Sequence, residues 1–148
     1  MRPDFRCSSV SQYHLSTLID LLRFRAYTQA DRRAYTFLVD GETQEAHVSY
    51  GVLDRQARAL AATLQALHLP GERVLVLYPP GLAYITAFYG CLYAGVIPVP
   101  TYPPVLRRAH RSMQRLWDII DDAQVRFVLT TQDLWHKMAV CYGSDPRF

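Results

Sequence analysis

Two groups of residues in this sequence could bind an anionic ligand, and the first comprises Pro79, Pro80 and Gly81. These residues come directly before an apolar run that is long enough for a helix, and the free backbone amides at a helix N-terminus can bind a phosphate group. However, two prolines remove two of those donors, and the sequence holds neither a G-x-G-x-x-G nor a G-K-S/T motif. A plain turn between a strand and a helix is therefore favoured over a phosphate-binding loop.

The second group is basic and comprises Arg107, Arg108, His110, Arg111 and Arg115. Three of the arginines are spaced by one helical turn, so in a helix they share a face. Such a face could contact an acidic protein surface or a phosphate group. Asp118, Asp121 and Asp122 follow in the same predicted helix and can neutralise part of the charge. A solvated helix surface is therefore the favoured interpretation.

Aromatic residues are dense enough to suggest a tunnel for a lipid chain, and they include Tyr78, Tyr84, Phe88, Tyr89, Tyr93 and Tyr102. Aromatic side chains more often fill a protein core, although ligand pockets are also mostly apolar. A core role is the favoured interpretation for most members of this set.

The residue types that bind metals or act as nucleophiles form no recognisable pattern. Cys7, Cys91 and Cys141 are far apart in the sequence, so neither a disulfide framework nor a zinc site is indicated. The five histidines are isolated and form no H-E-x-x-H motif. We therefore expect no catalytic residue, no cofactor-binding residue and no metal ligand in this chain.

Size and charge limit the classes of protein that this chain could represent. A chain of 148 residues can bury one core, and a net charge of +3 is too small to indicate a nucleic-acid partner. Reduced thiols and an N-terminus without the apolar segment of a signal peptide predict a cytoplasmic location.

The longest uncharged segment runs from Val74 to Leu106 and is interrupted by prolines and glycines. A transmembrane helix needs about 20 consecutive apolar residues, so these interruptions argue against a membrane span. The segment instead predicts a buried β-α-β unit with a strand at 73–78, a helix at 82–94 and a strand at 96–99.

The remaining elements follow from periodicity and turn signals. We expect an amphipathic helix at 15–29, a hairpin around Asp40-Gly41, and a helix that Ser49 caps and that ends near residue 68. In that helix the apolar side chains should face inward and Asp54 should face outward. The C-terminal part should form a helix at 107–123, a buried strand at 125–129 and a helix at 132–139. The pattern predicts an α/β fold with a mostly parallel sheet layered with helices, preceded by an N-terminal helix and a β-hairpin.

Two motifs resemble those of adenylate-forming ligases. The first is LYPPG at residues 77–81, followed by GCLYAGVI at 90–97 and VPTYPP at 99–104. The VPTYPP ending is most similar to the fatty acyl-AMP ligases. The second is VSYGVL at 48–53, which is similar to the Thr-Tyr-x-Glu-Leu element of the family, although Val52 stands where the family has Glu. The resemblance extends from about residue 15 to residue 131.

The resemblance implies an enzyme that activates a fatty acid with ATP and Mg²⁺ to an acyl-adenylate and transfers the acyl group to an acyl carrier protein. It also implies a Ser/Thr/Gly-rich phosphate loop ending in Pro-Lys-Gly, an adenine-binding motif, a ribose-binding Asp and a Lys on a mobile C-terminal domain. None of these motifs occurs in this sequence, whose only lysine is Lys137. Tyr102 is the residue that we expect to contact substrate, because it lies in the branch-specific VPTYPP segment.

The expected organisation is a polar leader at 1–14, a partial N-terminal domain of an AMP-binding enzyme at 15–139 and an irregular tail at 140–148. The chain is then the N-terminal portion of a fatty acyl-AMP ligase, inactive alone, whose partners are a fatty acid, a carrier protein and the remainder of the enzyme. The alternative is a free-standing small α/β module that binds a partner or an acyl group without catalysis.

Overall fold

The computed structural model describes residues 15–67, 69–104 and 109–143. The predicted polar leader at 1–14 and residues 144–148 of the predicted tail lie outside the described residues, and so do Arg107 and Arg108.

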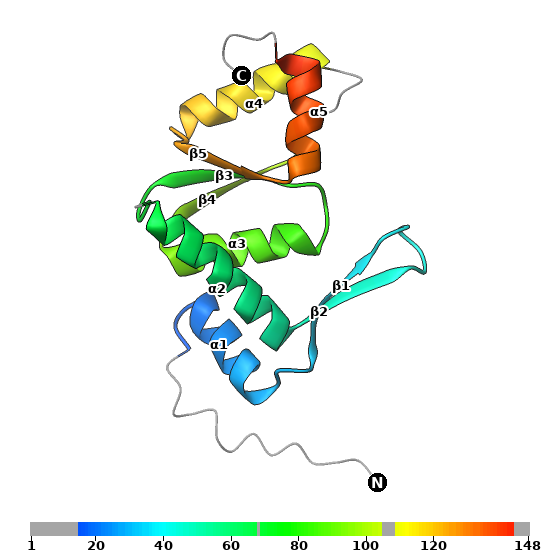
Figure 1. The fold of residues 1–148 in the computed structure, drawn as a ribbon, viewed down its shortest axis with the longest axis vertical. Helices are drawn as coiled ribbons and strands as arrows, with labels where there is room; N and C mark the ends of the chain where they lie inside the picture. Colours follow the sequence, from blue (N-terminus) through cyan, green and yellow to red (C-terminus); the bar gives the residue numbers. More distant parts are fainter. Residues whose placement is uncertain (1–14, 68, 105–108, 144–148) are drawn as a thin grey trace.

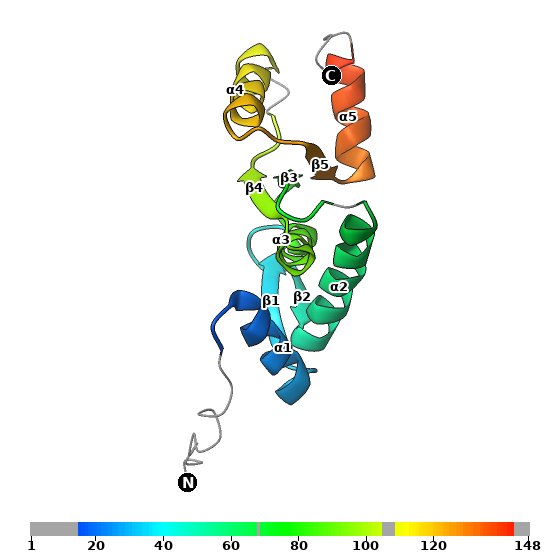
Figure 2. The same cartoon turned by 90° about the vertical axis from the view of Figure 1, so that its left-hand side faces the viewer.

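A three-stranded parallel sheet lies between two pairs of helices (Figure 1). Its strands are β3 (Arg73–Leu77), β4 (Ile97–Thr101) and β5 (Phe127–Thr130), in the order β4-β3-β5. The helices α2 (Tyr50–Ala66) and α3 (Leu82–Ala94) cover one face, and α4 (Ala109–Asp122) and α5 (Gln132–Tyr142) cover the other (Figure 2). The predicted α/β fold with a parallel sheet layered by helices is confirmed.

The N-terminal elements lie beyond α2 and α3, away from the parallel sheet (Figure 1). They are the helix α1 (Leu18–Thr28) and the antiparallel hairpin of β1 (Arg33–Leu38) and β2 (Glu45–Ser49). The predicted N-terminal helix and hairpin are therefore both present.

The central strand β3 joins two hydrophobic cores. Its residues alternate, so Val74 and Val76 pack with α2 and α3, whereas Leu75 and Leu77 pack with α4 and α5. None of the four is more than 1% exposed. The absence of charge in this part of the sequence is thus explained by burial on both faces.

The prolines of β4 are compatible with a strand because β4 is an edge strand among the described residues. The Ile97 N–H donates to the Glu72 carbonyl, so the backbone of Ile97 faces the side of β3. Pro98 and Pro100 alternate with the positions that face β3, and their missing N–H groups therefore lie along the outer edge. The strand continues to Thr101, two residues beyond the predicted end.

Local caps determine where several helices begin and end. The Thr17 hydroxyl accepts a hydrogen bond from the Asp20 N–H, so α1 begins at Leu18 and not at residue 15. The predicted cap at Ser49 is confirmed, because its hydroxyl accepts from the Val52 N–H at 3.4 Å. The boundaries of α3 match the prediction, and Gly95 ends it with φ 74°.

Three expectations about single segments were wrong. Asp54 is 9% exposed and not on the outer face of α2, because Tyr93 supplies a hydrogen bond to its carboxylate. Strand β5 is not fully buried, since Phe127 and Val128 are 38% and 46% exposed on a strand that lies at the edge of the sheet among the described residues. The helix expected to end at residue 139 continues to Tyr142, whose buried ring packs with Met138 in the α4–α5 core, so residues 140–142 of the predicted irregular tail are helical.

Candidate functional site

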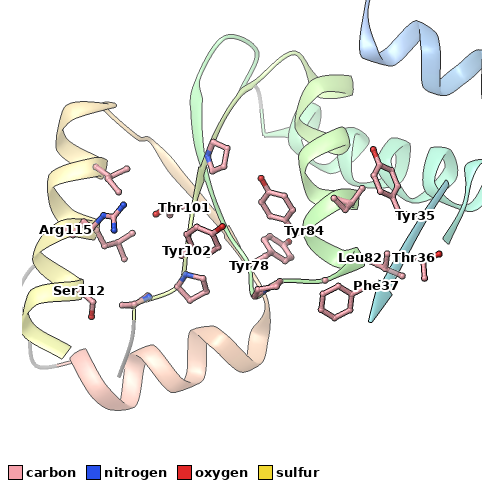
Figure 3. A pocket seen from close by; sticks show the side chains of 18 residues that line it. Tyr35, Thr36, Phe37, Tyr78, Leu82, Tyr84, Thr101, Tyr102, Ser112 and Arg115 are labelled. Atoms are coloured by element: carbon pink, nitrogen blue, oxygen red, sulfur yellow. The ribbon is translucent and has the colours of Figure 1, made fainter. Parts of the chain in front are cut away.

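A cavity of about 620 Å³ lies at the carboxyl ends of two neighbouring parallel strands. Tyr78 directly follows β3, Tyr102 directly follows β4, and both side chains line the cavity (Figure 3). Ligands of open α/β sheets bind at this edge, because the loops that leave the strands there are free to diverge. The cavity is therefore the candidate functional site, and its volume lies within the range of small-molecule pockets.

Four segments of the chain form the walls of this cavity. They are β1, the turn and first residues of α3, the loop after β4, and α4. Figure 3 shows the labelled side chains in a row from Ser112 and Arg115 on α4, past Tyr102 and Tyr78, to Tyr84 on α3 and Phe37 on β1. The cavity is thus elongated, with α4 at one end and the hairpin at the other.

Aromatic rings and apolar groups dominate the lining. Tyr78 and Tyr84 are half-buried, whereas Tyr102 is 82% exposed at the rim. Burial raises the pKa of Tyr78, so its hydroxyl stays protonated at neutral pH and can donate a hydrogen bond. These groups suit an apolar or amphipathic ligand.

Among the described residues that line the cavity, Arg115 is the one that carries a charge, and none of them is a carboxylate. The described residues contain no cluster of His, Cys, Asp or Glu that could hold a metal ion. The donor set of the cavity therefore does not fit Mg²⁺-bound ATP, which needs acidic metal ligands and several phosphate-binding donors.

The turn before α3 borders the cavity through Pro80 and Gly81. Gly81 has φ 155°, a backbone conformation that other residues rarely adopt, and no side chain caps the helix that follows. The predicted strand-to-helix turn is therefore present at the mouth of the cavity.

The hairpin wall is attached to α3 by a contact between two tyrosines. The Tyr35 and Tyr89 hydroxyl oxygens are 3.3 Å apart. Burial, followed by this hydrogen bond, raises the pKa of Tyr89. The contact holds β1 beside the cavity, where Tyr35, Thr36 and Phe37 form part of its wall.

The cavity includes some of the residues that the sequence suggested and excludes others. Tyr78, Tyr84 and Tyr102 line it, whereas Phe88, Tyr89 and Tyr93 do not. From the basic group, Arg115 lines the cavity and Arg111 does not, and the side chain of His110 lies outside the described residues. Sequence reasoning missed the contribution of β1, because no local pattern reveals that this hairpin packs beside a strand end more than 40 residues further along the chain.

Comparison with known proteins connects this architecture to a family. The model of the AMP-binding enzyme family matches residues 22–145. A medium-chain-fatty-acid–[acyl-carrier-protein] ligase, JamA of Moorena producens, is 47% identical over 121 residues, which are 82% of this chain and 20% of that protein. Disco-interacting protein 2 homolog B of Mus musculus is 36% identical over 79% of this chain and 8% of its own length.

A solved structure shows the same arrangement. The fatty acid AMP ligase of Legionella pneumophila superposes with a TM-score of 0.75 at 39% identity, covering 82% of this chain and 21% of that one. This chain therefore spans about a fifth of the length of the ligases that it matches, and it is similar to an N-terminal part of them. No helix of the described part of the chain is long and apolar enough to span a membrane. The resemblance noted in the sequence is confirmed, and the chain belongs to the AMP-binding enzyme family.

Proposed function

We propose that this chain forms one part of a fatty acyl-AMP ligase and that its cavity holds the acyl chain of the fatty acid. The observation that carries the proposal is the elongated, mainly aromatic and apolar cavity at the ends of β3 and β4. The whole enzyme would activate the fatty acid with ATP and Mg²⁺ and pass the acyl group to an acyl carrier protein. The similarity to a fatty-acid–[acyl-carrier-protein] ligase supports that choice of substrates.

The proposed role of this chain is binding and not adenylation. Adenylyl transfer needs cations and donors placed against the charge that develops on the phosphates. This sequence lacks the phosphate loop, the adenine-binding motif and the catalytic lysine that the family uses, and the described lining of the cavity offers a single guanidinium. We therefore expect the chain alone to be inactive, with the remainder of the enzyme supplying the chemistry. The free thiols of Cys91 and Cys141 fit a cytoplasmic location.

Binding of a fluorescent fatty acid tests the proposal. A dansyl-labelled undecanoate should bind the chain at low micromolar protein, and Tyr102→Ala should weaken that binding by about threefold to tenfold because an aromatic contact is lost. Tyr27→Ala is the matched control, because Tyr27 is 84% exposed and does not line the cavity. Equal affinities in the three proteins, or no binding, would contradict the proposal.

Exchange of pyrophosphate into ATP in the presence of decanoate tests the predicted inactivity. The chain alone should show no exchange above background, and measurable exchange would overturn the claim that the chemistry lies elsewhere in the enzyme.

The second candidate is a free-standing binding module without catalysis. It is favoured by one observation, namely that the described residues form the cavity without another chain. The DNA downstream of Phe148 distinguishes the two candidates. A reading frame that encodes a Ser/Thr/Gly-rich loop ending in Pro-Lys-Gly would support the ligase, and its absence together with strong expression of the short product would support the module.

A further inference from the structure

Three of the described arginines make ion pairs, and Arg115 is not one of them. Arg33 pairs with Glu45, Arg58 with Asp54, and Arg126 with Glu72. Arg115 has no ion pair within the described part of the chain, although it lies on the same helix as three aspartates. The nearest of these in sequence, Asp118, accepts a hydrogen bond from the Gln114 side chain at 2.8 Å. Within the described part of the chain, no ion pair therefore joins Arg115 to these aspartates.

The position of Arg115 gives the cavity two different ends. The guanidinium points toward the cavity from α4, whereas Leu82 and Phe37 lie toward the opposite end (Figure 3). Between the two ends lie the rings of Tyr78, Tyr84 and Tyr102. A guanidinium carries its charge at any physiological pH and binds a carboxylate through paired N–H donors.

We infer that Arg115 binds the carboxylate of a fatty acid and thereby fixes the direction of the ligand in the cavity, with the carboxylate at α4 and the methyl end at β1. This inference rests on the proposed function, because it requires an acyl chain in the cavity. An extended ligand with one anionic end matches an elongated cavity with one cationic end. Arg115 is a specificity-determining residue in this arrangement, since it distinguishes a fatty acid from a neutral alcohol of the same length.

The size of the effect follows from the exposure of Arg115. An ion pair that remains in contact with water contributes less than about 1 kcal/mol, which corresponds to about fivefold in affinity. Apolar contacts along the cavity should provide most of the affinity, and Arg115 should mainly provide the preference for an anion.

Displacement of the dansyl-labelled undecanoate by decanoate and by decan-1-ol measures that preference. Decanoate should displace the label at about threefold to fivefold lower concentration than decan-1-ol in the wild-type chain. The ratio should fall to about one in Arg115→Gln and persist in Arg115→Lys. Arg111→Gln is the matched control, because it removes the same charge from the same helix at a position that does not line the cavity.

The outcomes separate this inference from the proposed function. Displacement by both ligands with equal potency in the wild-type chain would overturn the role of Arg115 and leave the acyl site intact. Loss of the preference for decanoate in Arg111→Gln as well as in Arg115→Gln would also overturn it, because the preference would then arise from the net charge of the helix. Failure of either ligand to displace the label would instead contradict the proposed acyl site itself.

Photo-crosslinking of the wild-type chain tests the direction of the ligand without any substitution. A decanoate that carries a diazirine at its methyl end should label residues 35–37 of β1 and residues 82–85 of α3. Decyl phosphate that carries the same group should give the same labelling pattern if the cavity recognises an anion of either kind at Arg115. Labelling of residues 112–116 of α4 by the decanoate would reverse the direction and overturn the inference.

Discussion

Cys91 is a fully buried thiol at the centre of the core between α3 and the sheet. Burial raises its pKa to about 11, so very little thiolate forms near pH 8, and the thiolate is the reactive species. We expect iodoacetamide to alkylate the exposed Cys141 at about pH 8 and to leave Cys91 unmodified until the chain is unfolded in urea. Mass spectrometry of a Cys7→Ser variant would show this, and alkylation of Cys91 in the folded chain would contradict it.

The same shift makes stability depend on pH. A folded pKa above the ordinary thiol value of 9.0 means that the folded state holds the proton more tightly. The contribution of Cys91 to the free energy of unfolding is therefore complete below pH 9.0 and is lost as the pH rises through about 11. Cys91→Ala should remove this component of the pH dependence of the free energy of unfolding. Urea titrations of both proteins at several pH values would measure the difference.

Asp54 shows why some site and core residues could not be predicted from the sequence. The spacing in α2 placed its apolar stripe correctly, but the partner of Asp54 is the Tyr93 hydroxyl, which lies at 2.5 Å and 39 residues further along the chain. A local pattern contains no information about such a contact. Arg115 is a similar case, because the sequence indicated a basic face but not which arginine would face the cavity.

At the scale of elements, the packing of α3 against α2 depends on Gly90. A Cβ atom placed there would lie 2.7 Å from Leu60 Cδ2 and 3.1 Å from Leu60 Cβ. Gly90→Ala should therefore lower the free energy of unfolding by about 1 kcal/mol, because overpacking outweighs the gain in helix propensity. In a Leu60→Ala background the same substitution should change the free energy of unfolding by less than about 0.5 kcal/mol, because the contact with Leu60 Cδ2 is removed while the 3.1 Å contact with Cβ remains and is offset by the gain in helix propensity.

Urea denaturation of the wild-type chain, the two single variants and the double variant gives the effect of Gly90→Ala in each background. A destabilisation by Gly90→Ala of equal size in both backgrounds would show that contact with Leu60 is not the cause.

Element boundaries could be predicted where a local signal determines them. The helix α3 lies between Gly81 and Gly95, both of which have positive φ, and its predicted range is the observed one. Strand β5 lacks such a signal, and its apolar sequence did not distinguish a central strand from an edge strand. The hairpin was predicted as an element, but its place beside the cavity depends on the contact between Tyr35 and Tyr89.

At the scale of the whole molecule, the two edges of the parallel sheet have opposite properties. The outer edge of β4 lacks two N–H donors because of Pro98 and Pro100. The outer edge of β5 contains no proline, and Phe127 and Val128 beside it are partly exposed. A cavity of about 370 Å³ next to β5 adds exposed apolar surface from Trp135. Exposed strand edges with apolar side chains promote association between chains.

We therefore expect the chain to be monomeric at low micromolar concentration and to self-associate through β5 as the concentration rises. Val128→Lys should reduce that association, because a lysine on an edge strand disfavours pairing with a second strand. Val140→Lys is the matched control, since it adds the same charge at a side chain that is 87% exposed on α5 and distant in sequence from the strand edge. Sedimentation velocity over a concentration series would measure the effect. Equal suppression by both variants would show that net charge, and not the β5 edge, governs association.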